Sequence, residues 1–344
     1  MHHFLCLFLL LSIKATAAPL TFDDPKPQHY HLKARASMID PRVKAHPKIN
    51  FLIEKDGKPA DVQDASVDTR VTPRGKLVIW LMGHNSDFFR ILNEQGLHVI
   101  RPHYANKWFS ICCKGRPVSE HCRGNIRLEA ATGEDHSDQV SIPKPDSIKE
   151  RAFQFVKHLA KEHPQGKWGF FLNKEKTDLN WENVILSGSS HGSTTAARLA
   201  KHTKVSRVVA FCGPRDQHQT WQSLVSATPE NRYFGYSHIL DQGWEEDHYC
   251  RSWELLGMHK FGPIVNVEKA KPPFENTRRL VTDVDVKNDP KRAHGAVLPK
   301  KILPKTKDGN YSHEAVWKYL FTHPVDQVGK PQPLDDSCLK NHPQ

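Results

Sequence analysis

The residues whose identity and spacing most clearly suggest catalysis form a pentapeptide in the middle of the chain. Residues 188–192 have the sequence Gly-Ser-Ser-His-Gly, with glycines two positions before and two after Ser190. The apolar run at 184–186 predicts a buried strand before it, and the residues from Thr194 predict a helix after it. A serine on a sharp turn between strand and helix presents its hydroxyl above the sheet, so Ser190 is a candidate nucleophile.

A serine hydroxyl needs help to react at neutral pH. It requires a base within hydrogen-bond reach, and the base requires a carboxylate to orient it. The backbone N–H of His191, at the start of the expected helix, would face the reacting oxygen. Without such partners, the pentapeptide would be only a Ser- and Gly-rich loop. The rest of the chain must therefore supply a histidine and an acid at the same sheet edge.

Buried strands alternate with helices along most of the chain, which predicts an α/β fold with a doubly wound, mostly parallel sheet flanked by helices. The expected strands are 76–82, 97–100, 183–187, 205–211, 233–240 and 279–286, with early edge candidates at 49–54 and 67–71. The last strand alternates apolar and polar residues, as a half-exposed edge strand does. Ser86, Ser147 and Ser312 are the expected helix caps, and Ser147 and Glu150 form a capping box.

These features resemble the α/β-hydrolase superfamily over roughly residues 75 to 322. The resemblance rests on the pentapeptide, the strand that ends at 82–85, Asp241 and His294. In that superfamily the nucleophile, acid and histidine follow one another along the chain. The resemblance therefore implies the triad Ser190, Asp241 and His294. Asp216, which follows the preceding strand, is the alternative acid.

The resemblance also implies a pair of backbone donors for the developing oxyanion. One is the N–H of His191, and the other is expected from His84 or Asn85, after the strand 76–82. Many members carry His-Gly at that second place, whereas this chain has Gly83 before His84. This chemistry requires no cofactor. No metal site is expected either, because the chain has no Cys-x-x-Cys pair.

The N-terminus predicts export. A ten-residue apolar run at 4–13 precedes the small-x-small sequence at 15–17, as in a secretory signal peptide spanning 1–18. Residues 19–50 are expected to form an extended lead-in, and 51–323 the α/β-hydrolase domain with a cysteine-containing insertion at 101–145. Residues 324–344 would form a Pro-rich tail. The protein is therefore expected to be secreted or periplasmic, without an integral membrane segment after signal removal.

Six cysteines remain after the expected cleavage, and an even number in an exported chain indicates disulfides. The local pairing of Cys122 with Cys113 or Cys112 is favoured, and the other pairings stay open. Trp108 and Phe109, in the same insertion, are candidates for lining a pocket or for ordinary core packing. The insertion would then form one wall of the site.

The chain of 344 residues carries a formal charge of +11. Such a charge favours solubility or attraction to anionic surfaces such as polysaccharide. No basic run with interleaved aromatic residues occurs, so nucleic acid is not an expected partner. The sequence predicts a serine hydrolase for small or polymeric carboxylic esters, of unknown oligomeric state. A peptidase or amidase with the same triad, and a non-catalytic binding protein on a hydrolase scaffold, are the alternatives.

Overall fold

A nine-stranded sheet organises the part of the chain that the computed structural model describes, residues 20–115, 118–216, 219–241 and 249–340. The strand order is β1-β4-β6-β5-β7-β8-β9-β11-β10. The strands are β1 (His29–Arg35), β4 (Val62–Asp68), β5 (Leu77–Leu81), β6 (His98–Arg101), β7 (Val184–Ser189), β8 (Arg207–Phe211), β9 (Tyr233–His238), β10 (Ile264–Asn266) and β11 (Arg279–Thr282). A two-stranded hairpin joins β2 (Glu54–Lys55) to β3 (Lys58–Pro59).

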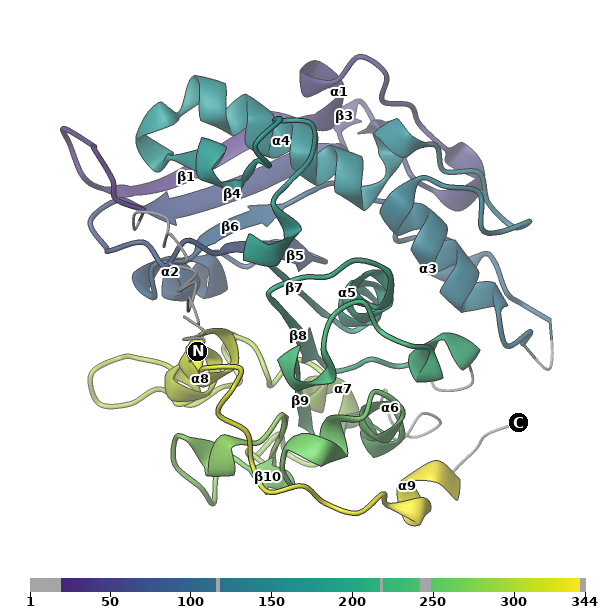
Figure 1. The fold of residues 1–344 in the computed structure, drawn as a ribbon, viewed down its shortest axis with the longest axis vertical. Coiled ribbons are helices and arrows are strands. Elements are labelled where there is room, and N and C mark those ends of the chain that lie inside the picture. The colour runs from purple at the N-terminus through teal and green to yellow at the C-terminus, as the bar shows by residue number, and fades with distance from the viewer. Residues whose placement is uncertain (1–19, 116–117, 217–218, 242–248, 341–344) are drawn as a thin grey trace, which may run out of the picture.

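Helices cover both faces of this sheet (Figure 1). Their bounds are α1 (Ala36–Ile39), α2 (Ser86–Glu94), α3 (Cys122–Thr132), α4 (Ile148–Glu162), α5 (His191–His202), α6 (Tyr249–Leu255), α7 (Pro290–Ala293), α8 (Glu314–Thr322) and α9 (Asp336–Lys340). The strands from β6 to β10 run parallel, and β4 is antiparallel to β1 and to β6. The predicted doubly wound, mostly parallel sheet is thereby confirmed.

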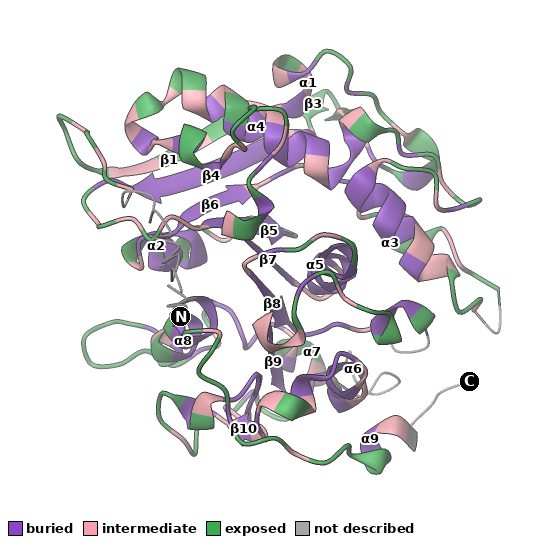
Figure 2. Cartoon of the chain, in the orientation of Figure 1, coloured by how far each residue is buried: buried purple, intermediate pink, exposed green. Residues whose placement is uncertain are grey.

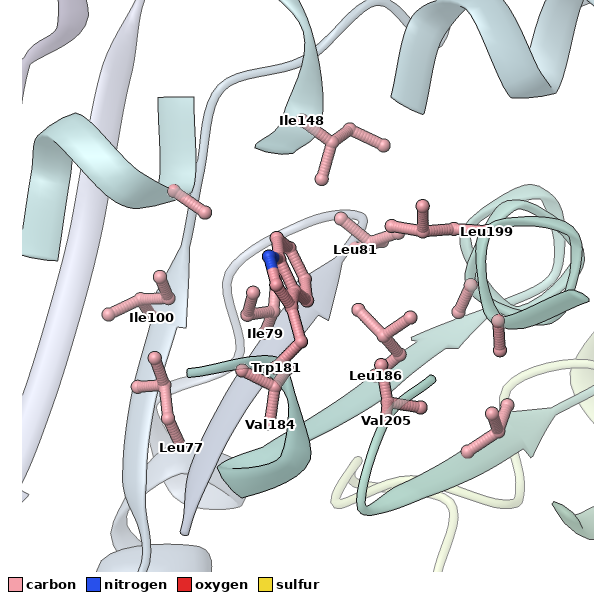
Figure 3. Packing of buried hydrophobic residues seen from close by; sticks show 14 of the residues in the cluster. Leu77, Ile79, Leu81, Ile100, Ile148, Trp181, Val184, Leu186, Leu199 and Val205 are labelled. Carbon is pink, nitrogen blue, oxygen red and sulfur yellow. The ribbon is translucent and has the colours of Figure 1, made fainter. Parts of the chain in front are cut away.

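The central strands are buried on both faces because their side chains alternate between two cores (Figure 2). In β5, Leu77, Ile79 and Leu81 belong to one hydrophobic cluster, whereas Val78 and Trp80 belong to the other. The first cluster lies between the sheet and the helices α4 and α5, as the close view in Figure 3 shows. The second cluster lies between the sheet and the helices α2 and α8.

The pairing register aligns the carboxyl ends of β5, β7 and β8. Leu81 lies opposite Gly188, and Ser189 lies opposite Phe211. The turns that follow these three strands therefore meet at one edge of the sheet, where ligands bind in open α/β sheets.

The segment expected to be an extended lead-in contributes a strand to the sheet. β1 pairs with β4 along its full length, and Tyr30, Leu32 and Ala34 pack against the core. Histidine, lysine and arginine occupy the alternate positions of β1. The apolar period of two is therefore hard to distinguish from an irregular polar segment. The early strand candidates at 49–54 and 67–71 were misplaced. β4 begins at Val62 and lies inside the sheet, and only Glu54 of the first candidate is in a strand.

The structure differs from the sequence expectations at four further places. The insertion at 101–145 contains a regular helix, α3, which packs on α5. The strand β11 is fully buried because β10, which was not foreseen, covers it as the edge strand. The cap of α2 is Asn85, whose side chain accepts a hydrogen bond from Phe88 N, rather than Ser86. The cap of α8 is His313, and its side chain makes no capping hydrogen bond.

Two disulfides link segments of the described chain. Cys113 is bonded to Cys122, one of the two local pairings expected, and Cys250 is bonded to Cys338. The second bond attaches the C-terminal tail, including α9, to α6. Within the described residues, Cys112 and Cys212 are free thiols. The expected signal peptide, 1–18, lies outside the described residues. None of the helices described has the length and apolar character needed to cross a bilayer.

Candidate active site

Ser190 occupies a strained turn between β7 and α5. Its backbone angles are φ 55° and ψ −118°, which a residue with a Cβ adopts only at a cost. The flanking glycines explain why the turn closes. A Cβ on Gly192 would lie 1.9 Å from the carbonyl oxygen of Leu81, and a Cβ on Gly188 would lie 2.6 Å from that oxygen. Only glycine fits at these two positions, so the sequence spacing is a packing requirement of this turn.

Hydrogen bonds fix the backbone of Ser190. Its N–H donates to the carbonyl oxygen of Phe211 at the end of β8 (2.9 Å). Its carbonyl oxygen accepts hydrogen bonds from the hydroxyls of Ser193 (2.7 Å) and Thr194 (3.0 Å), both on the first turn of α5. The side chain of Ser190 therefore starts from a rigid backbone, as a preorganised nucleophile requires.

His294 and Asp241 come together at the same sheet edge. Nδ1 of His294 lies 2.8 Å from Oδ1 of Asp241 and 3.0 Å from Oδ2. Asp241 follows β9 and its side chain is fully buried, whereas the His294 side chain, at the end of α7, keeps 33% of its surface exposed. A buried carboxylate that accepts from Nδ1 leaves Nε2 of the imidazole free to act as a base.

The two-residue turn after β8 connects this pair to Ser190. The thiol of Cys212 lies 3.2 Å from the carbonyl oxygen of His294, and a Cβ on Gly213 would lie 3.5 Å from the carbonyl oxygen of Ser190. Burial and the neighbouring Asp241 carboxylate raise the pKa of the Cys212 thiol well above its ordinary value. Cys212 is therefore a neutral thiol that supports the His294 loop, a contact that no sequence pattern indicates.

His191, the residue after Ser190, is held by α3. One guanidinium nitrogen of Arg127 donates to the carbonyl oxygen of His191 (3.1 Å) and to the hydroxyl of Thr195 (2.8 Å). The ring of Trp108 lies 5.0 Å from the His191 ring. Burial and the Arg127 charge lower the pKa of His191 well below its ordinary value, so its imidazole is neutral at physiological pH.

Phe109, the other aromatic candidate of the insertion, has its ring centroid 5.7 Å from the His191 ring and is 44% exposed. The insertion thus reaches the turn at residues 188–192, which we call the elbow.

Asp216, the alternative acid, forms an ion pair with the same arginine. Nε and Nη2 of Arg127 bond to the two carboxylate oxygens of Asp216, the second at 3.0 Å, and both side chains are 1% exposed. A carboxylate paired in this way has its acceptor capacity committed to Arg127. The structure therefore places the alternative acid in an ion pair that braces the elbow, whereas Asp241 is the carboxylate on His294.

The side chains of His84 and Asn85 both point to partners away from the elbow. The ring of His84 stacks on His31 at 4.8 Å, and the amide of Asn85 caps α2 and donates to the carbonyl oxygen of Pro299. The residue of this loop that packs on the elbow is Met82. Its side chain lies 2.6 Å from the position of a Cβ on Gly192, and its φ is 134°.

Two groups of side chains, among the residues described, have the composition of metal ligands. They are His31, Asp64 and His84 on the surface, and Cys212, Asp241 and His294 at the site. Arg101 bonds to Oδ2 of Asp64, so a cation already neutralises the carboxylate of the first group. In the second group, the nitrogen and the carboxylate that would bind a metal are hydrogen-bonded to each other.

The sequence singles out residues 188–192, Asp241 and His294 as candidates, but it carries no signal for Arg127, Met82 or Cys212. Arg127 lies on a helix that the sequence did not predict. Cys212 is one of the six cysteines for which the sequence suggests disulfides, whereas the structure has it as a free thiol. Met82 is the last residue of the expected strand 76–82. No sequence pattern indicates that a methionine there has a positive φ.

Comparison with known proteins finds distant structural likenesses only. No family model and no curated protein matches the sequence. Similar solved structures include esterase B from Lactobacillus rhamnosis, with a TM-score of 0.34, 12% identity and 78% of each chain covered. An S-formylglutathione hydrolase from Agrobacterium tumefaciens has a TM-score of 0.34 and 13% identity, over 57% of this chain and 76% of that one.

A third neighbour is XC6422 from Xanthomonas campestris, described as an α/β serine hydrolase without a lid. Its TM-score is 0.31 at 11% identity, over 64% of this chain and 78% of that one. With TM-scores of 0.31 to 0.34, these likenesses carry no argument about this chain. The chain's own strand order, with Ser190 in a strained turn between β7 and α5, carries the conclusion. The protein has the α/β-hydrolase fold.

Proposed function

We propose that the protein is a serine hydrolase that cleaves carboxylic esters through an acyl-enzyme on Ser190. The observation that carries the proposal is the conformation of Ser190, with φ 55° on a turn closed by two glycines. Strain of this kind persists only where the surrounding structure imposes it, and it gathers at reactive positions. The Asp241–His294 pair at the same sheet edge supports the assignment, because it supplies the base that a serine needs.

In the proposed reaction, Nε2 of His294 takes the proton from the Ser190 hydroxyl as its oxygen attacks the ester carbonyl carbon. The tetrahedral intermediate then collapses, the bond to the leaving alcohol breaks, and His294 returns the proton to the alcohol oxygen. Water repeats the sequence on the acyl-enzyme and releases the acid. Asp241 holds the tautomer with the proton on Nδ1 and stabilises the imidazolium that forms.

Backbone donors would stabilise the oxyanion. We assign one to the N–H of His191, at the first position of α5, where the helix dipole also favours negative charge. For the second we add Met82 to the candidates His84 and Asn85, because Met82 packs on the elbow. Arg127 acts as a positioning residue: its bond to the His191 carbonyl oxygen fixes the peptide that carries the first donor.

Labelling with a fluorophosphonate, followed by mass spectrometry of the modified peptide, tests the proposal. We expect a single adduct on Ser190 that disappears in His294→Ala. Hydrolysis of an ester should exceed that of the amide with the same acyl group. Folded, oxidised protein that forms no adduct would instead favour a binding protein on a hydrolase scaffold, and faster amide cleavage would make it an amidase or peptidase.

We also propose that the protein is exported. The apolar run at 4–13 and the two disulfides support this, because disulfides persist in oxidising compartments. Protein isolated from the producing cells should begin at residue 18 or 19 in N-terminal sequencing. Isolation of a chain that still contains residues 1–17 would contradict the proposal.

A further inference from the structure

The carboxylates next to Ser190 are already committed to other groups. Asp216 is held by Arg127 through both of its oxygens, and Asp241 is hydrogen-bonded to His294. Both carboxylates are buried. Arg127 and His294 thus occupy these two carboxylates, and within the described residues neither carboxylate forms an ion pair with Arg215.

Arg215 provides a further positive charge. It follows the turn after β8, and its side chain is half-buried. Its Nε is buried and has no hydrogen-bond partner within the described residues. Native proteins seldom leave a buried nitrogen of a guanidinium without an acceptor, because the lost hydration is costly. An unpaired arginine beside a reactive group is well suited to bind a carboxylate of a substrate, since its planar fork matches the two oxygens.

The backbone of Arg215 is attached directly to the elbow. Its N–H donates to the hydroxyl of Thr194 (3.1 Å), and that hydroxyl donates to the carbonyl oxygen of Ser190 (3.0 Å). The guanidinium therefore starts from a backbone position two hydrogen bonds away from the nucleophile. The Arg215 charge also contributes to the lowered pKa of His191, and it opposes the raised pKa of the Cys212 thiol.

A second cation, Lys107, also contributes to the lowered pKa of His191. Lys107 lines a pocket of about 240 Å³ together with Met82 and Tyr104, and no aspartate or glutamate belongs to that lining. Met82 is the pocket residue that packs on the elbow, so the pocket borders the reaction centre. Arg215 and Lys107 thus both act on His191, and two cations close to the elbow would concentrate anions there.

We propose that Arg215 forms an anion subsite next to Ser190, with Lys107 as a second contributor, and that the preferred substrates are esters bearing a carboxylate or similar negative group. This inference rests on the proposed function, because it uses Ser190 as the reacting group. It goes further in naming the charge of the substrate. A carboxylate on the acyl chain and one on the leaving alcohol share the same chemistry, and the experiment separates them.

Two pairs of esters test the subsite. 4-Nitrophenyl hydrogen adipate and 4-nitrophenyl hexanoate share a six-carbon acyl chain and differ in the terminal carboxylate. 4-Carboxyphenyl butyrate and phenyl butyrate place the difference on the leaving group. We expect at least one anionic ester to exceed its neutral partner by about tenfold or more in kcat/KM at low ionic strength, the effect of a hydrogen bond to a charged group. Added salt should reduce the ratio.

Variants assign the preference to a residue. Arg215→Gln should lower kcat/KM for the anionic ester about tenfold more than for its neutral partner, and Arg215→Lys should retain part of the preference. Lys204→Gln is the matched control, since it removes one exposed charge before the opposite end of β8. That control should keep the wild-type ratio. Equal rates for both members of both pairs in the wild type, or an unchanged ratio in Arg215→Gln, would overturn the subsite.

Failure of the subsite and failure of the proposed function give different results. Fluorophosphonate labelling of Ser190 without any anion preference removes the subsite alone. If neither labelling nor turnover is seen, the proposed function fails. The subsite is then tested by measuring whether the protein binds an anionic ester. In that case, calorimetric titration with monomethyl adipate should show a heat of binding with Ser190→Ala and none with Ser190→Ala/Arg215→Gln. Equal binding by both proteins, or by neither, would rule the subsite out.

Discussion

Nδ1 of His294 lies 2.8 Å from Oδ1 of Asp241, although 53 residues separate them in the sequence. The contact forms because each residue follows a strand or helix that ends at the carboxyl edge of the sheet. Asp241 comes shortly after β9, and His294 follows α7. The carboxylate is fully buried and the imidazole is partly exposed, so the pair presents one nitrogen to the solvent side of the site.

Asp241→Asn is expected to lower kcat by about 10³- to 10⁴-fold on a chromogenic ester. An amide at this position can donate to Nδ1, which favours the tautomer with the proton on Nε2 and removes the base. Steady-state kinetics, with circular dichroism to establish folding, measure the effect. A loss of less than tenfold in a folded variant would show that Asp241 does not orient the base.

Asp216→Asn is expected to act mainly on stability. Its removal leaves the Arg127 guanidinium buried without a counterion, which typically costs about 3–5 kcal/mol. Urea unfolding should show this loss, and the effect on kcat should be smaller than that of Asp241→Asn. If Asp216→Asn instead lowered kcat more than Asp241→Asn at unchanged stability, the orienting acid would be Asp216.

Ser190→Ala should lower turnover by more than about 10³-fold, while the melting temperature barely moves, because alanine keeps the Cβ and hence the strain. Ser190→Gly should be more stable than Ser190→Ala by about 1 kcal/mol or more, since glycine adopts a φ of 55° without that strain. Thermal and urea unfolding of the two inactive variants give the comparison. Unchanged turnover in Ser190→Ala would refute the assignment, and a less stable glycine variant would show that Ser190 is not strained.

The central strands were predictable because they are continuous apolar runs. β5, β7 and β8 are covered on both faces, so the apolar runs at 77–81, 184–186 and 208–211 stand out in the sequence. β1 was missed for the opposite reason. It pairs on one side only, and its outward positions carry His31 and Lys33. The short edge strand β10 has three residues, too few to establish a period.

The candidate site likewise has features that the sequence predicts and features that it does not. Ser190 was identifiable because its packing demands glycines at fixed spacing, and this demand is visible in the sequence. The contacts that hold this turn in place could not be predicted from the sequence. The bond between Arg127 and the His191 carbonyl joins α3 to α5, 64 residues apart, and depends on how two helices pack. Contacts of that kind follow from tertiary structure and leave no local pattern.

Gly192→Ala is expected to prevent folding or to destabilise the protein by several kcal/mol. The new Cβ would lie 1.9 Å from the carbonyl oxygen of Leu81. This oxygen belongs to the backbone of a central strand, and shifting the strand would disrupt the packing of the sheet. Gly169→Ala is the matched control, because its Cβ would meet only Ala160 at 3.9 Å. Urea unfolding compares the two variants. A Gly192→Ala protein as stable as the control would mean that β5 and α5 are not in close contact.

Stability should fall as the pH is lowered from 6.5 to 4, because of His98. Burial among the rings of Trp168 and Phe171 lowers the pKa of His98 from 6.5 to about 4, although its bond to Gly166 O opposes the shift. Between these values the unfolded chain binds a proton that the folded protein does not, so the free energy of unfolding decreases with falling pH.

The contribution of His98 is fully present above pH 6.5, and about 3 kcal/mol of it is lost by pH 4, at about 1.4 kcal/mol per pH unit. His98→Gln keeps a neutral donor for Gly166 O and removes the titration, so its unfolding free energy should decline less steeply over this range. The exposed His121→Gln should keep the wild-type slope. Urea unfolding at half-unit pH steps measures all three slopes. Equal slopes for wild type and His98→Gln would show that His98 is not buried as a neutral imidazole.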